Sequence, residues 1–123
     1  MRFAQRVFLI CGLLGIAMLA PMYFTEALYS HNYPPAINHP EFYYGFVGLA
    51  LVFQFAFLII ASDPLRYRPL MLIGVLEKIV FGAAAIPLAI LGRTPAIMAL
   101  AGCLDLTMGV FFALAWWQTR ERM

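Results

Sequence analysis

Charged residues are scarce in this chain of 123 residues, at 11% of the total, whereas an ordinary soluble domain has about 25%. The formal net charge is only +2 and the sequence contains no basic patch, so nothing favours a nucleic-acid-binding protein. Hydrophobic residues reach 64%, far more than the core of so small a protein needs. We therefore expect lipid to surround most of the chain.

Catalytic and cofactor-binding motifs are also missing. The two cysteines, Cys11 and Cys103, lie in apolar segments without CxxC spacing, so we interpret both as small buried apolar residues. No Ser-His-Asp arrangement, phosphate loop or GxGxxG motif occurs, and no histidine lies in a long apolar segment where it could hold haem. His31 and His39 are weak candidates for an external metal site because their spacing matches no ligand motif. We expect neither a metal nor a cofactor.

Four apolar segments are long enough to cross a bilayer, for which about 20 residues are needed. These segments are residues 7–24, 42–61, 69–91 and 96–117. The sequence therefore predicts an all-α fold in which residues 1–123 form a single domain, an integral membrane four-helix bundle. Short connections predict that the second, third and fourth helices are sequential antiparallel neighbours. Residues 25–41 would form a long, aromatic outward loop.

The basic residues predict the orientation of these segments. Six arginines fall on one side and Arg93 alone falls on the other; the six are Arg2, Arg6, Arg66, Arg68, Arg120 and Arg122. Under the positive-inside rule, this distribution places both termini in the cytoplasm. We expect a multi-pass protein of the bacterial inner (plasma) membrane.

Three ionisable residues lie inside the apolar segments: Glu77 and Lys78 in the third, and Asp105 in the fourth. Each costs several kcal/mol in hydrocarbon unless it pairs or reaches water, so such residues indicate a functional site. Lys78 and Asp105 each lie in a stripe of small residues, which is typical of helix–helix contacts. An axial offset of about 7–8 Å separates the two, and Lys78 could cross it directly or through a water.

Glu77 is rotated by about 100° from Lys78 around the helix, so we do not expect the two to be partners. Gln54 of the second segment lies at the depth of Glu77, which predicts a hydrogen bond between them. The polar layer has two interpretations. In one, it only fixes which helices pair. In the other, it is a proton-titratable or ligand-binding site, in which Glu77 carries the proton and Lys78 attracts an anionic or carbonyl group.

The stretch RYRPLMLIGVLEKIVFGAAAIPLAILGR, with its RPLM–LEK–GR pattern, resembles a group of uncharacterised small bacterial membrane proteins. In architecture alone, the chain also resembles the DoxX-like four-helix families. Neither resemblance implies a known activity. Length and span number are similar to those of small multidrug transporters, but that family places its essential glutamate in the first helix, and residues 7–24 contain no acid.

Three hypotheses of function follow from the polar layer. The first, which we favour, is a binding or accessory membrane protein that holds a small lipophilic ligand, a lipid headgroup or a partner helix. The second is a proton-coupled transporter that acts as a homo-oligomer, with Glu77 as the carrier. The third is a membrane enzyme that acts on a lipid or quinone. The expected surroundings are the lipid bilayer and a homo-oligomer or another membrane protein.

Overall fold

The structure is a computed structural model that describes residues 2–120, and every regular element in this range is helical. The elements are α1 (Arg2–Leu19), the 3-10 helix η1 (Ala20–Phe24), α2 (Glu26–Asn32), α3 (Pro40–Ser62), α4 (Arg68–Ile90) and α5 (Ile97–Thr119). The prediction of an all-α fold is confirmed for this range. Arg122, which contributes to the charge distribution described above, lies outside it.

Four stretches are long and apolar enough to cross a membrane: Arg2–Phe24, Pro40–Ser62, Arg68–Ile90 and Ile97–Thr119. An α-helix of 23 residues is about 34 Å long, which exceeds the hydrocarbon thickness of about 30 Å. The last three begin and end within two residues of the expected segments. Large apolar side chains are exposed on all four, such as Leu13, Leu49, Val80 and Val110. A surface of this kind suits lipid and is rare on soluble monomers.

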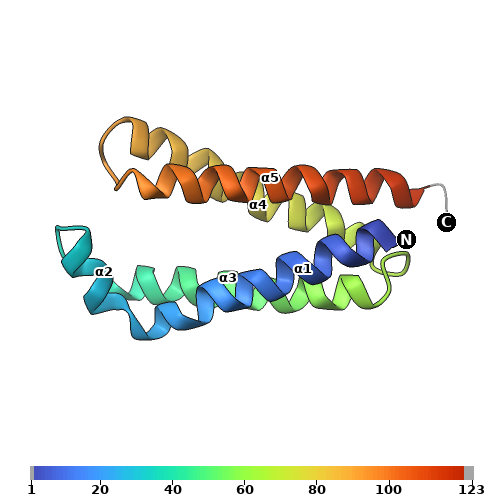
Figure 1. Cartoon of the computed structure of the whole chain (residues 1–123), viewed down its shortest axis with the longest axis horizontal. Helices are drawn as coiled ribbons and strands as arrows, with labels where there is room; N and C mark the ends of the chain where they lie inside the picture. The colour runs from blue at the N-terminus through green and yellow to red at the C-terminus, as the bar shows by residue number, and fades with distance from the viewer. Residues whose placement is uncertain (1, 121–123) are drawn as a thin grey trace.

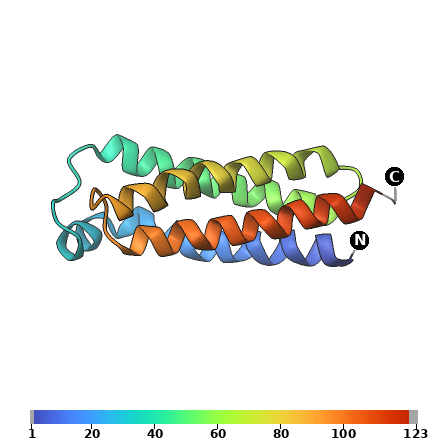
Figure 2. The same ribbon diagram turned by 90° about the horizontal axis from the view of Figure 1, so that it is seen from above.

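The four long helices form two hairpins (Figures 1 and 2). α1 packs against α3, and α4 packs against α5. In Figure 1 the hairpins lie close together at the end that holds both termini, and they separate towards the end that holds α2. At the first of these ends, α1 also contacts α5.

The second, third and fourth helices were expected to be sequential antiparallel neighbours, and the first of these pairs, α3 and α4, is the more loosely packed. α3 and α4 approach each other at few points, although a short turn joins them. Aromatic rings fill the space between them: Phe46 of α3 stacks on Phe81 of α4, with ring centroids 5.5 Å apart. Rings hold two backbones apart, whereas small residues let them approach, as Gly82 and Gly102 do between α4 and α5.

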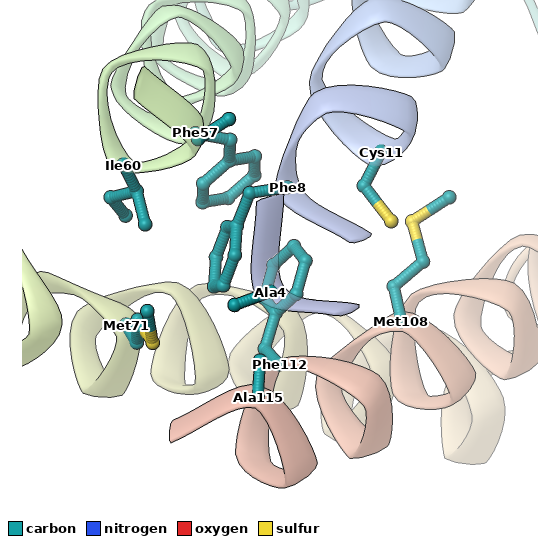
Figure 3. Close-up of a cluster of buried hydrophobic side chains, with 10 residues drawn as sticks. Ala4, Phe8, Cys11, Phe57, Ile60, Met71, Met108, Phe112 and Ala115 are labelled. Carbon is teal, nitrogen blue, oxygen red and sulfur yellow. The ribbon is translucent and has the colours of Figure 1, made fainter. Parts of the chain in front are cut away.

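A cluster of aromatic rings joins the two hairpins (Figure 3). Phe8 of α1 stacks on Phe112 of α5 at a centroid distance of 4.3 Å, and Phe57 of α3 meets Phe112 edge-on at 4.8 Å. All three rings are almost completely buried, and Met71 of α4 packs in the same cluster. Residues from every long helix therefore meet in one core.

The segment between the first two spans is more ordered than the predicted loop. Pro21 lies at the start of η1, where its ring is compatible with the first turn of a helix. The short helix α2 then occupies part of residues 25–41, which the sequence analysis treated as loop. Tyr43 donates a hydrogen bond to the carbonyl of Met22, and Tyr44 donates one to Glu26. These contacts fix η1 and α2 over the start of α3.

At the opposite end, Arg68 ties the two ends of the second hairpin together. Its guanidinium donates hydrogen bonds to the carbonyl oxygen of Trp116 and to the hydroxyl of Thr119. The guanidinium also lies 4.4 Å from the centroid of the Trp116 ring, in a cation–π contact. A cation at the C-terminus of α5 is further stabilised by the helix dipole.

Replacing Gly82 by Ala tests the close packing of α4 on α5. The new Cβ would lie 2.5 Å from Cγ of Leu106 and 3.1 Å from the carbonyl oxygen of Gly102, so the helices must separate. We expect the free energy of unfolding to fall by about 1–3 kcal/mol, measured by SDS titration in mixed micelles with circular dichroism.

The matched control is Gly45→Ala in α3, where the added Cβ has no neighbour within 4 Å. This change should stabilise the protein by about 0.5–1 kcal/mol, because alanine loses less backbone freedom than glycine on forming a helix. Equal effects of the two substitutions would show that α4 and α5 are not closely packed at Gly82.

Candidate functional site

The ammonium of Lys78 lies between two carboxylates. Its Nζ is 3.4 Å from Oε2 of Glu77 and 3.6 Å from Oδ1 of Asp105. The Lys78 side chain is only 5% exposed, and those of Glu77 and Asp105 are 15% and 22% exposed. The expected approach of Lys78 to Asp105 is confirmed as a direct ion pair between α4 and α5.

The lack of a side chain at Gly109 of α5 leaves room for the side chain of Lys78. A Cβ at Gly109 would lie 3.2 Å from Cβ of Lys78, so the lysine stem passes over the space that a side chain would fill. Asp105 precedes Gly109 by four residues, about one helical turn, on the same face of α5. Lys78 therefore starts at the level of Gly109 and extends about one turn to reach the acid.

The expectation that Glu77 and Lys78 are not partners is wrong. It rested on the directions of their Cα–Cβ bonds, which do differ by about 100° around the helix. Both side chains are long and flexible, however, and their charged ends meet beyond the helix surface at 3.4 Å. The ammonium has three hydrogen atoms to donate and can serve two carboxylates at once.

Gln54 does not form the expected hydrogen bond to Glu77. Its Nε2 donates instead to the carbonyl oxygen of Ala50, one turn earlier in α3, at 2.7 Å. The residue is 1% exposed, and its Oε1 has no hydrogen-bond partner among the described residues. Oε2 of Glu77 likewise accepts no hydrogen bond there.

These four polar side chains line one cavity of about 190 Å³ between the two hairpins. The rest of the lining is apolar and consists of Gly15, Met18, Leu19, Met22, Phe46, Ala50, Phe81, Met98, Ala101, Leu104 and Met108. The aromatic core borders the polar end, where Nζ of Lys78 is 5.3 Å from the ring centroid of Phe57 and 6.0 Å from that of Phe112. The cavity thus has a charged cluster at one end and an apolar lining elsewhere.

The contribution of the first helix to this cavity was missed by the sequence analysis. A Cβ on Gly15 would overlap the amide of Gln54, and one on Gly12 would lie 3.0 Å from the carbonyl oxygen of the same residue. Glycine at both positions lets α1 approach α3 closely enough to support Gln54. The two glycines, three residues apart in an apolar segment, could have indicated from the sequence that this helix packs closely on another.

The other candidate residues lie elsewhere. Cys11 is buried as expected, but Cys103 is exposed on the outer surface of α5, which corrects its predicted burial. His39 contacts Glu41 at 3.2 Å at the start of α3, far along that helix from Gln54. His31 lies in α2, and no group of three or more potential metal ligands occurs within residues 2–120.

Comparison of the chain with protein-family models, with curated proteins and with solved structures found no match. The chemistry of the site therefore has to be argued from its own geometry.

The cluster carries an excess of one negative charge when its groups are ionised, because two carboxylates face one ammonium. Net charge is costly in a low-dielectric interior unless it is neutralised. Lys78 faces both acids, so their negative charges oppose the attraction of its ammonium for an anion. The cluster can bind a proton or another cation.

Replacing Lys78 by Met tests this charge arrangement. The substitution leaves two carboxylates without a counter-charge, and we expect the free energy of unfolding to fall by about 3–5 kcal/mol. Asp105→Asn should cost less, because Glu77 and Lys78 remain as a balanced pair. SDS titration of purified proteins in the same micelles measures both changes.

The triple variant Glu77→Gln, Lys78→Met, Asp105→Asn provides the control, because it removes all three charges while it keeps the side-chain volumes similar. We expect it to recover most of the stability that Lys78→Met loses. A Lys78→Met protein as stable as the parent would show that the ammonium does not hold the two acids together.

Proposed function

We propose that this chain is a multi-pass integral membrane protein that binds a small lipophilic ligand in the cavity between its two hairpins. Gln54, Glu77, Lys78 and Asp105 form the polar end of the binding site, and the methionines and phenylalanines of the lining contact the apolar part of the ligand. Such a site has the usual composition of ligand pockets, which are mainly apolar with a few polar groups that orient the ligand.

The observation that carries the proposal is the convergence of four polar side chains from three helices on one apolar cavity. A layer that served only to fix helix pairing would satisfy its own polar atoms. Here Oε1 of Gln54 is buried and accepts no hydrogen bond from the described residues, and two acids share a single ammonium. A buried acceptor without a partner is costly, so this layer is not fully satisfied by its own groups.

We also propose that both termini lie in the cytoplasm and that the protein occupies the bacterial plasma membrane. Both termini and the turn between α3 and α4 lie at one end of the molecule (Figure 1), so Arg2, Arg6, Arg66, Arg68 and Arg120 gather there. Arg93 follows the other end of α4. This separation of charge supports the orientation under the positive-inside rule.

Filling the cavity tests the binding function. Ala101 lines the cavity from α5, and Ala101→Phe should occupy much of its volume. We expect mass spectrometry of small molecules and lipids that co-purify with the parent to find a retained compound. Its amount should fall about tenfold in Ala101→Phe, because the bulky ring and the ligand compete for the same space.

The matched control is Ala84→Phe, which adds the same ring on the exposed surface of α4. This variant should retain as much of the compound as the parent does. The binding function is wrong if the parent retains no specific compound, or if both variants retain it equally.

Proton-coupled transport by a homo-oligomer is the second candidate, and the excess negative charge favours it. A proton on the cluster would neutralise that charge, and the cavity between the hairpins gives one face of a path. Transport predicts flux into liposomes that depends on a pH gradient and disappears in Glu77→Gln, with Glu41→Gln as the control. Flux that persists in Glu77→Gln would exclude Glu77 as the carrier. No observation favours a membrane enzyme over these two functions.

A further inference from the structure

The charge and the unsatisfied atoms of the cavity identify the class of molecule that it takes. We infer that the ligand is a small organic cation, a protonated amine with an apolar body, rather than an anion or a neutral lipid fragment. This inference rests on the proposed binding function and adds the chemistry of the ligand to it.

The first argument is electrostatic. When all three groups are ionised, two carboxylates and one ammonium leave one negative charge uncompensated, and all three groups line the cavity. A ligand with one positive charge makes the cluster neutral. An anion would raise the excess to two negative charges at a site that water does not screen. Lys78, the only lysine of the chain, is already bound on both sides by Glu77 and Asp105.

The second argument concerns hydrogen bonds and is independent of charge. Nε2 of Gln54 donates one hydrogen bond to the carbonyl of Ala50, and Oε1 accepts none from the described residues. Three of the four polar side chains that line the cavity carry acceptor oxygens, and the single ammonium among them already faces two carboxylates, so the site favours a ligand that donates. An ammonium donates three hydrogen bonds and accepts none, which matches a site that offers acceptors and has its one cationic donor occupied.

The third argument is size. A cavity of about 150 Å³ in a protein interior holds benzene, so one of 190 Å³ suits a single ring or a short alkyl chain next to the charged group. Four methionines, Met18, Met22, Met98 and Met108, form much of the apolar lining. Thioether side chains are flexible and polarisable, so they adapt to apolar bodies of different shape.

Benzylammonium, benzyl alcohol and benzoate test the inference, because they share one ring and differ in charge. Equilibrium dialysis against protein-loaded nanodiscs, with subtraction of the signal from empty nanodiscs of the same lipids, separates binding from partition into lipid. We expect the parent to bind benzylammonium about tenfold more tightly than benzyl alcohol and to bind no benzoate, because a charge-assisted hydrogen bond is stronger than a neutral one.

Glu77→Gln should weaken benzylammonium binding about tenfold and weaken benzyl alcohol binding by a smaller factor, because it removes the excess charge, which acts on the cation alone. Glu41→Gln, which removes an exposed acid at the start of α3, is the control and should change neither. If Glu77→Gln does not fold, Asp105→Asn removes the same charge from the other side of Lys78 and should have the same effect.

The outcomes separate the two proposals. If benzyl alcohol or benzoate binds the parent at least as tightly as benzylammonium and Ala101→Phe abolishes that binding, the cavity binds a ligand but the cation inference is wrong. Absence of benzylammonium binding at millimolar concentration also overturns the cation inference. The binding function itself is decided by the compound that co-purifies with the parent and with Ala101→Phe.

Discussion

The polar interior of this protein depends on one ammonium group held between two carboxylates. Lys78 contacts Glu77 on its own helix and Asp105 on α5, so it makes the buried acids tolerable and links the two helices of the second hairpin. Removing either acid leaves a balanced pair, whereas removing the lysine leaves two uncompensated charges. One ammonium shared by two acids therefore lowers the cost of burying both carboxylates in an apolar environment.

Helix packing sets the surroundings of this group. Glycines let α4 approach α5 and let α1 approach α3, so each hairpin is internally close-packed. Between the hairpins, aromatic rings take the place of small residues and keep the backbones apart. The rings of Phe8, Phe57 and Phe112 close the space at one end (Figure 3), and the cavity remains on the other side of them. Close packing within hairpins and looser packing between them therefore produce the cavity.

Local sequence was sufficient to predict the helices. A span is defined by about 20 consecutive apolar residues and by the proline, glycine and polar residues that flank it, and none of these signals depends on distant parts of the chain. Periodicity also identified most of the contact face of α4. The small-residue stripe that contains Lys78 was predicted to consist of Gly74, Lys78, Gly82, Ala85 and Ala89; the first four are buried and Ala89 is half-buried. The small helix α2 was missed because its seven residues are too few to show a periodic pattern.

The sequence by itself determined that this is an all-α chain with four helices able to span a membrane, and that Glu77, Lys78, Asp105 and Gln54 lie within them. Only the tertiary structure decided which of these groups pair, that Gln54 remains without a partner for Oε1, and that α1 completes the cavity. Depth follows from counting residues along a helix. Partnership depends on which helices pack closely and on where long flexible side chains end, and both are set by contacts between residues far apart in the chain.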